Sequence, residues 1–273
     1  MKNRFKFKIS IAIFTLVFAG CSSSSKVSHP DDPFESFNRA SYQFNSKLDK
    51  YMLKPIAQVY DTVTPNPVKK GVLNFFVNLG EVSTMSNDLL QGHPIYAAKD
   101  FFRFAINSTI GVAGTIDIAT HMQFPRRYND FGITLAKWGV KRSPYLVIPF
   151  IGPSTFRDGL GLLVNLKYLT LWPYIKPNSL RNSLFALDII SLRSALLDAD
   201  GVMKEAALDP YVFIRNAYLQ KRSRLIYSNS ELSGENNGQG SDPLGQDNLD
   251  FALGTETGAP TDSPQQQISE PPL

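Results

Sequence analysis

Apolar residues recur every three or four positions along most of residues 31–227, the spacing that places them on one face of an α-helix. In the first such segment Phe34, Phe37 and Phe44 share a face, which we interpret as the side packed on a core. The same period returns in four later segments, residues 65–82, 93–110, 181–200 and 208–227. The pattern predicts an all-α fold of one domain, since a region of this length can bury a single core.

Helix starts are marked by residues that satisfy free backbone N–H groups. Asp32 can cap the first helix, with Pro33 at its first position and Glu35 at its third, which makes an Asp-x-x-Glu capping box. Asp209 and Pro210 repeat the Asp-Pro opening before the last helix. We therefore predict helix starts at both Asp-Pro pairs.

Proline and glycine set the boundaries of the middle helices. Pro67 fits the start of one helix, and residues 86–91 predict a separate short helix that ends at Gly92. Pro94 then opens the next helix, which gives way to a run of small residues at 111–114. Because glycine lets two backbone segments approach closely, we expect a close contact there.

The pattern changes in residues 131–161, where glycine, proline and aromatic residues interrupt any long helical period. Residues 143–150 are strand-like, but no hairpin signal pairs them with a second strand. The segment is also unusually apolar for a surface loop. We expect it to be buried in the protein or to contact lipid.

Residues 161–175 are almost all apolar up to Trp172, yet they are fewer than the roughly 20 residues that a membrane-spanning helix needs. Two interpretations stay open, a helix of the core and a helix lying in the membrane interface. In the second, Trp172 and Tyr174 are candidate interfacial anchors, because rings with one polar atom favour the headgroup level.

Residues 1–20 have the pattern of an export signal, with four basic residues and no acid before a short uncharged apolar run. Ala19, Gly20 and Cys21 follow, and together they resemble a bacterial lipoprotein signal whose cysteine becomes the acylated N-terminus. Cys21 is the only cysteine, so it cannot form an internal disulfide. The serine run after it disfavours the alternative of a buried core cysteine. By the same resemblance, Ser22 implies the outer membrane as destination.

Both ends of the chain lie outside the predicted helical domain of residues 31–227. Residues 21–30 are predicted to form a lipidated linker, and residues 228–273 a disordered acidic tail too polar to offset its ordering entropy. Without the basic signal and this tail, residues 21–227 carry a net charge of +8. That charge favours anionic partners such as phospholipid headgroups, and export argues against nucleic acid.

The last predicted helix ends in a basic cluster of Lys221, Arg222 and Arg224. Positive charge there complements the negative C-terminal end of the helix dipole. Contact with phosphate groups is the alternative, and both interpretations stay open.

The chain lacks the residue patterns of catalysis. His29, His93 and His121 have no metal-ligand spacing, and the residues around Ser154 do not form a nucleophile elbow. Asp130 opens a DFG tripeptide, but the other kinase motifs are absent. We expect a protein that is not an enzyme and that needs no cofactor or metal. A lipid hydrolase is disfavoured because no catalytic triad can be drawn.

Six motifs resemble, in order, those of the VacJ family, the MlaA outer-membrane lipoproteins of phospholipid transport. The motifs are DPFESFNR (32–39), NFFVNLGE (74–81), RFAINSTIGVAGTIDIA (103–119), DFGITLAKWGV (130–140), PYLVIPFIGPSTFRDGLG (144–161) and LDPYVFIRNAYLQKR (208–222). The family often has Glu-Pro in place of Glu81-Val82 and Gly-Pro-Tyr in place of residues 143–145. Neither departure removes a reactive group.

The resemblance implies a ring of amphipathic helices around a central channel, embedded in one membrane leaflet at the periplasmic face of the outer membrane. It implies that mislocalised phospholipids are removed from the outer leaflet and passed to a soluble periplasmic carrier, and that the protein associates with a trimeric porin. A channel with a polar wall lowers the cost of desolvating the phosphate. The alternative is a structural lipoprotein that scaffolds the porin without moving lipid.

Polar residues inside the otherwise apolar motifs are the candidate channel or headgroup contacts. They are Asn74, Asn78, Arg103, Asn107, Asp117 and Lys137. Each has an alternative role in capping a helix or binding backbone groups, and Asn107 and Asp117 are well suited to local turns.

Overall fold

The computed structural model describes residues 30–200 and 208–231. It confirms the predicted helical fold, to which it adds one pair of short strands. The elements in chain order are α2 (Glu35–Leu48), the π-helix η1 (Asp49–Leu53), α3 (Lys54–Val63), α4 (Asn66–Leu90), α5 (Pro94–Thr109), α6 (Ile118–His121), α7 (Phe131–Lys137), β1 (Tyr145–Ile148), β2 (Gly152–Thr155), α8 (Phe156–Val164), the π-helix η2 (Asn165–Leu169), the 3-10 helix η3 (Trp172–Tyr174), α9 (Asn178–Ala195) and α11 (Pro210–Glu231). The predicted signal and Cys21 lie outside the described residues.

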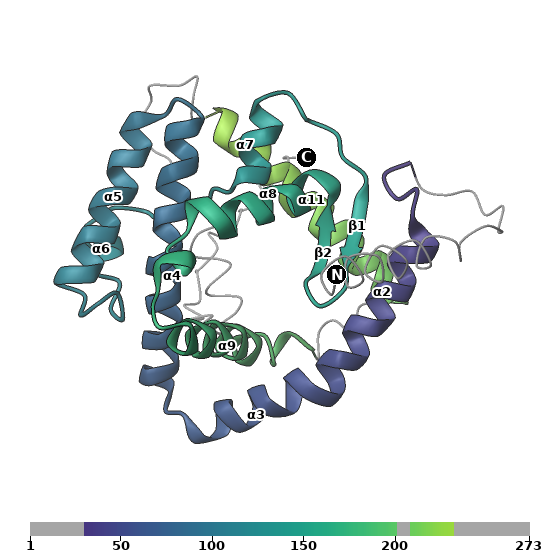
Figure 1. Ribbon diagram of the computed structural model, residues 1–273, viewed down its shortest axis with the longest axis horizontal. Helices are drawn as coiled ribbons and strands as arrows, with labels where there is room; N and C mark the ends of the chain where they lie inside the picture. Colours follow the sequence, from purple (N-terminus) through teal and green to yellow (C-terminus); the bar gives the residue numbers. More distant parts are fainter. Residues whose placement is uncertain (1–29, 201–207, 232–273) are drawn as a thin grey trace, which may run out of the picture.

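The helices form a ring, as the family resemblance implied (Figure 1). α2, η1 and α3 follow one curved path along the outside, α4 forms the opposite side, and α8 with the strand pair completes the circle. α9 lies beside α3 and contacts α4, while α5 packs along the outer side of α4. α11 contacts α7 and β2.

Two asparagine side chains of α2 join it to the strand pair and so close the ring. The buried amide of Asn38 donates to the carbonyl of Tyr145 (3.0 Å) and accepts from the N–H of Val147 (2.8 Å). Two turns further on, the side-chain carbonyl of Asn45 accepts from the N–H of Phe150 (2.7 Å). These amides satisfy backbone groups on the edge of β1 that β2 leaves unpaired.

The helices α7 and α8 meet at two glycines. A Cβ atom on Gly161 would lie 2.5 Å from the backbone nitrogen of Gly132, closer than any side chain permits. The two helices therefore pack with their backbones in contact, which only glycine allows at these positions.

The predicted capping box at Asp32 is wrong. α2 begins at Glu35 and has no side-chain cap. Asp32 is fully buried instead, and its carboxylate accepts hydrogen bonds from Asn38, Tyr211 and Arg215. It lies beside a small apolar cluster that includes Tyr145 and Tyr211. The residues just before α2, which we call the first segment, are thus bound to α11.

The second Asp-Pro pair acts as predicted. α11 begins at Pro210, and the carboxylate of Asp209 accepts from the N–H groups of Tyr211 (3.0 Å) and Val212 (3.3 Å). The helix continues to Glu231, past the predicted domain end at residue 227.

The separate short helix predicted at residues 86–91 is wrong, because α4 runs without a break from Asn66 to Leu90. Its second half buries polar side chains such as Ser83 and Asn87, which interrupt the apolar period without interrupting the helix. Gly92 follows with a φ of 78°, the left-handed conformation that ends a helix, and Pro94 opens α5.

The strand pair was not predicted. β1 and β2 are antiparallel, with Tyr145 opposite Thr155 and Ile148 opposite Gly152. The turn between them places Phe150 at a φ of 68°, where asparagine or glycine is the usual residue. The normal hairpin signal is therefore absent from the sequence.

Candidate functional site

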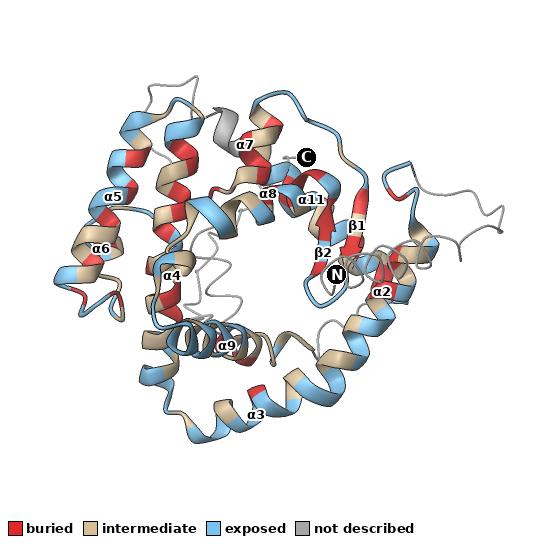
Figure 2. Ribbon diagram, viewed as in Figure 1, coloured by how far each residue is buried: buried red, intermediate tan, exposed pale blue. Residues whose placement is uncertain are grey.

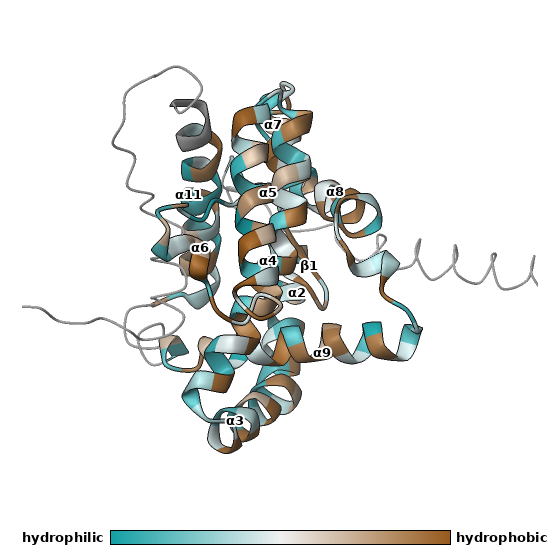
Figure 3. Ribbon diagram, turned by 90° about the vertical axis from the view of Figure 1, so that its left-hand side faces the viewer, coloured by the Kyte–Doolittle hydropathy of each residue, from teal (hydrophilic) through white to brown (hydrophobic). Residues whose placement is uncertain are grey.

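The distribution of polar and apolar side chains is reversed relative to a soluble protein. Within the part of the chain that the structure describes, buried polar and charged residues outnumber buried apolar ones. The buried positions gather on α4, α7 and the strand pair (Figure 2), and hydrophobic residues run along α9 and α5 (Figure 3). Large apolar side chains such as Tyr51, Ile95 and Leu163 are at least 65% exposed. Exposed apolar area of this extent fits contact with hydrocarbon or with another protein.

The largest fully buried side chain among the described residues is that of Arg103 on α5, which is 1% exposed. Its guanidinium donates to the Glu81 carboxylate on α4 (3.1 Å) and to the hydroxyl of Thr120 (3.1 Å). It also lies 3.3 Å from the carboxylate of Asp117, which accepts from the amide of Asn107 (2.9 Å). These five residues, which we call the arginine cluster, tie α4 and α5 to α6.

The charges within the arginine cluster depend on one another. Burial raises the pKa of Glu81, and the positive charges of Arg103 and Arg126 oppose that rise. Burial also favours the neutral form of Asp117, but the hydrogen bond from Thr120 and the charge of Arg103 outweigh it and lower the pKa. One Glu81 oxygen, Oε2, has no hydrogen-bond partner among the described residues. Arg103 therefore acts on both carboxylates in the same direction, lowering the pKa of each against the effect of burial.

Asn74 binds the turn that follows α5, and Asn78 binds the last turn of α5 itself. The amide of Asn74 donates to the Thr115 carbonyl (3.1 Å), and the amide of Asn78 donates to the Ser108 hydroxyl (2.8 Å). Gly114 has a φ of 86°, and a Cβ atom there would lie 2.6 Å from the Asn78 amide nitrogen. A Cβ atom on Gly111 would lie 2.2 Å from the backbone carbonyl oxygen of Ile116, so the predicted close backbone approach in this run of small residues is confirmed.

Five of the six predicted contact residues thus lie together between α4, α5 and α6, and each has a bonding partner in the protein. Lys137 lies apart, on α7, where it is half-buried. Burial lowers its pKa, and the described residues give it no hydrogen bond or ion pair. The role of all six as channel or headgroup contacts stays a prediction.

A second polar cluster, which the sequence did not reveal, joins α4, α5 and the segment before α7. Asp88 and Asp100 share the guanidinium of Arg127, which lies 2.9 Å from Asp100. The amide of Asn129 donates to Asp88 (2.7 Å). Both carboxylates are at most 2% exposed. We call these four residues the aspartate pair cluster.

Replacing Asp100 by asparagine is expected to stabilise the protein increasingly as the pH rises. Burial, with a hydrogen bond that protonated Asp100 donates to Asp88, raises the pKa of Asp100 from 3.8 to about 8, although Arg127 opposes the rise. Between these values the folded protein holds a proton that the unfolded chain has lost, so stability falls by up to about 1.4 kcal/mol per pH unit. Asparagine removes this loss. Urea unfolding between pH 4 and 9 measures it.

The gain should be near zero at pH 4, grow toward pH 8 and then level off. Asp88→Asn is the opposing variant, because it removes the carboxylate to which Asn129 and Arg127 both donate, and it should destabilise. The exposed Asp198→Asn is the neutral control. A constant difference between Asp100→Asn and the wild type across this range contradicts the assignment.

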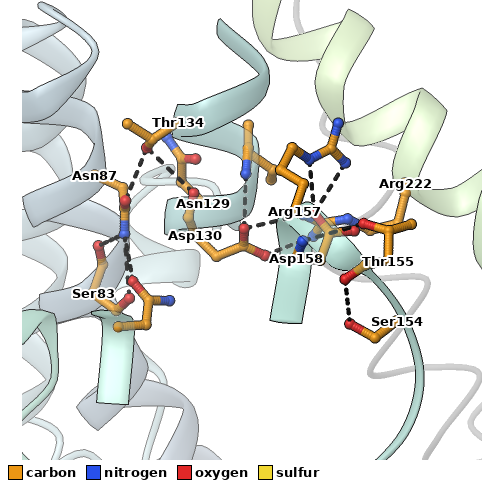
Figure 4. Close-up of polar contacts among 12 residues, drawn as sticks. Ser83, Asn87, Asn129, Asp130, Thr134, Ser154, Thr155, Arg157, Asp158 and Arg222 are labelled. Atoms are coloured by element: carbon orange, nitrogen blue, oxygen red, sulfur yellow. Dashed lines mark hydrogen bonds and ion pairs between the residues drawn. The ribbon is translucent and has the colours of Figure 1, made fainter. Parts of the chain in front are cut away.

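A third cluster fixes α11 to α7 and α8 (Figure 4). The buried guanidinium of Arg222 donates to Asp130 (2.6 Å) and to Asp158 (2.7 Å), and the hydroxyl of Tyr218 donates to Asp158 (2.8 Å). Asp130 also caps α7 by accepting from the N–H of Ile133 (2.9 Å). Neither interpretation of the basic cluster fits Arg222, whose charge is matched by the carboxylates of Asp130 and Asp158.

The two predicted interfacial anchors have different surroundings. Trp172 is half-buried, with its ring stacked on Phe76 at 6.1 Å and against the edge of Phe185 at 5.4 Å. Tyr174 is 70% exposed. Their position relative to a membrane stays a prediction.

Two further features are absent from residues 30–200 and 208–231. No three side chains of His, Cys, Asp or Glu are grouped so that they could hold a metal ion. No helix there has the length and apolar content needed to cross a bilayer.

Known proteins resemble the chain over most of its length. The family model described as MlaA lipoprotein matches residues 30–225. The intermembrane phospholipid transport system lipoproteins MlaA of Shigella flexneri and of Escherichia coli (strain K12) are each 36% identical over 234 residues, which is 84% of this chain and 91% of theirs. A chain from work on the structural basis for maintenance of bacterial outer membrane lipid asymmetry superimposes with a TM-score of 0.63 and 34% identity, covering 71% of this chain and 98% of that one. The chain therefore belongs to the MlaA lipoprotein family.

Proposed function

We propose that this protein is a lipoprotein of phospholipid transport at the periplasmic face of the outer membrane. It removes mislocalised phospholipids from the outer leaflet and passes them to a soluble periplasmic carrier. The names of its relatives in intermembrane phospholipid transport support this assignment. The acylated Cys21 delivers the protein to the membrane, and a trimeric porin is its partner there.

The observation that carries the proposal is the reversed polarity of the fold. Exposed apolar side chains on most helices suit a body that lies in the hydrocarbon of one leaflet. Polar groups held inside the ring offer a route for a charged headgroup, which would otherwise be desolvated at high cost. The acyl chains can remain in contact with apolar surface throughout. No bond is formed or broken in such a passage.

Lys137 is the side chain that we assign to the phosphate along this route. It is half-buried and carries a positive charge that no described carboxylate matches. The other five predicted residues bond to protein groups, so in this proposal they hold the ring in shape around the lipid.

A deletion strain complemented with variants tests the proposal. Deletion should raise the phospholipid exposed on the cell surface and the sensitivity to detergent, and the wild-type gene should restore both. Cys21→Ser should fail to restore them, because the chain then lacks the acyl groups whose buried CH₂ units each contribute about 0.8 kcal/mol to membrane binding. Ser23→Ala is the matched control and should restore both. Unchanged surface phospholipid in the deletion strain rules the function out.

The alternative is a lipoprotein that only scaffolds a porin. A photoreactive residue at Lys137 separates the two functions. Crosslinks to phospholipid support transport, whereas crosslinks to porin without any to lipid support the scaffold.

A further inference from the structure

α9 carries an exposed apolar stripe. Phe185, Ile189 and Leu192 follow one another at helical spacing and are 40–52% exposed. The opposite face is buried, with Ser191 at 1% and Ser194 at 7% exposure, and it packs against α3 and α4. The stripe thus lies away from Ser191 and Ser194, and one of its members, Phe185, also packs against the ring of Trp172.

Asp188 lies at the edge of this stripe. Phe185 is three positions before it and Leu192 four positions after it, so both are its neighbours on the helix surface. The residue is half-buried, and its backbone carbonyl accepts from the hydroxyl of Ser191 (2.9 Å). Its carboxylate has no hydrogen bond or ion pair within the described ranges. Burial raises the pKa of Asp188 to about 6, so it is ionised at neutral pH.

The cations near the α3–α9 contact are already paired. Arg193 donates to Asp49 (2.7 Å) and to Asp200 (2.9 Å), and Lys54 binds the same Asp200. Lys69 binds Asp61 (2.6 Å). Asp188 is left as an unmatched negative charge on a partly desolvated surface. Such a charge is unfavourable until a cation joins it.

We propose that Asp188 binds the ammonium group of an ethanolamine phospholipid whose acyl chains lie on the apolar stripe of α9. The inference rests on the proposed function and names the headgroup that this part of the protein prefers. A carboxylate accepts charge-assisted hydrogen bonds from the N–H groups of a primary ammonium, while glycerol headgroups present only hydroxyls and a negative phosphate. Carriage of an ethanolamine lipid would therefore be favoured over that of a phosphatidylglycerol.

Lipid competition on the purified, acylated protein tests the inference. Protein in nanodiscs of equal phosphatidylethanolamine and phosphatidylglycerol is extracted into mild detergent, and the retained lipids are quantified by mass spectrometry. The wild type should retain phosphatidylethanolamine in excess, and Asp188→Asn should reduce that excess about threefold to fivefold, the factor expected for a partly exposed ion pair. Asp188→Glu should keep it, as should the exposed Asp198→Asn.

Two further measurements distinguish a failure of this inference from a failure of the proposed function. Wild-type protein offered N-acetyl phosphatidylethanolamine, which lacks the positive charge, should show no preference, and this arm needs no variant to fold. Equal headgroup ratios in the wild type and Asp188→Asn, with normal total lipid, overturn the inference and leave the proposed function standing. Absence of retained phospholipid from all forms overturns both.

Discussion

Replacement of Arg103 by alanine is expected to lower the free energy of unfolding by about 3–5 kcal/mol, the cost of removing one partner of a buried ion pair. Arg103 is 1% exposed and contacts Glu81 on α4 and Asp117 at the start of α6. Without it Glu81, whose pKa burial already raises, loses its nearest cation and takes up a proton. The attachment of α5 to α4 weakens as a result. Urea unfolding in detergent micelles, followed by far-ultraviolet circular dichroism, measures the loss.

Two other substitutions provide reference values for the loss of stability caused by Arg103→Ala. Arg103→Lys keeps the charge but cannot reach both carboxylates and Thr120 together, so an intermediate loss is expected. Arg224→Ala removes an exposed arginine and should change stability by less than about 0.5 kcal/mol. If Arg103→Ala unfolds at the same urea concentration as Arg224→Ala, the arginine cluster does not stabilise the fold.

Local rules predicted the features that depend on a few neighbouring residues. Pro94 opens α5, Gly92 follows α4, and Asp209 caps α11, because each residue acts on backbone groups within one helical turn. The small residues at 111–114 were likewise interpreted correctly, since a Cβ atom on Gly111 would lie 2.2 Å from the Ile116 carbonyl. These interactions need no knowledge of the tertiary fold.

Features set by distant contacts were missed or assigned wrongly. α4 continues without a break because the polar side chains of its second half can be buried against hydrogen-bonding partners. For example, the hydroxyl of Thr134 donates to Asn87 (2.8 Å). The strand pair depends on Asn38, whose backbone partners lie more than a hundred residues away. Neither partner can be identified from the local pattern, so the end of α4 was assigned to a separate short helix and the strand-like residues 143–150 were left without a pairing partner.

The site residues likewise divide into those that the local sequence identifies and those that depend on distant contacts. Polar residues inside apolar motifs were chosen as candidate channel contacts, a role that stays a prediction, and three of them, Arg103, Asn107 and Asp117, lie in one cluster. Sequence alone could not show that their partners are protein groups. Arg222 was noticed only as part of a basic helix end, because its partner Asp130 precedes it by 92 residues. Nothing in the sequence pointed to Asp188 as a site residue, because its lack of a partner among the described residues is visible only in the structure.

Asp32→Asn is expected to detach the first segment of the chain from α11, at a cost of about 3 kcal/mol or more. The Asp32 carboxylate is fully buried and accepts from Arg215 (3.1 Å), Tyr211 and Asn38. Asparagine has nearly the same shape but no charge, so the guanidinium of Arg215 stays buried without its anion. Hydrogen exchange in α11 and β1 should quicken, because Asn38 joins Asp32 to the backbone of β1.

The neighbouring Asp31→Asn is the control for this result. Asp31 is exposed, and its backbone carbonyl, which accepts from the N–H of Tyr145 (2.8 Å), is unchanged by the substitution. A much smaller loss of stability and unchanged exchange in α11 are expected. If Asp32→Asn leaves α11 and β1 as protected as Asp31→Asn does, then the ring is held closed by its helix packing alone. If only Asp32→Asn loosens both elements, a single buried carboxylate joins the first segment, α2 and the last helix.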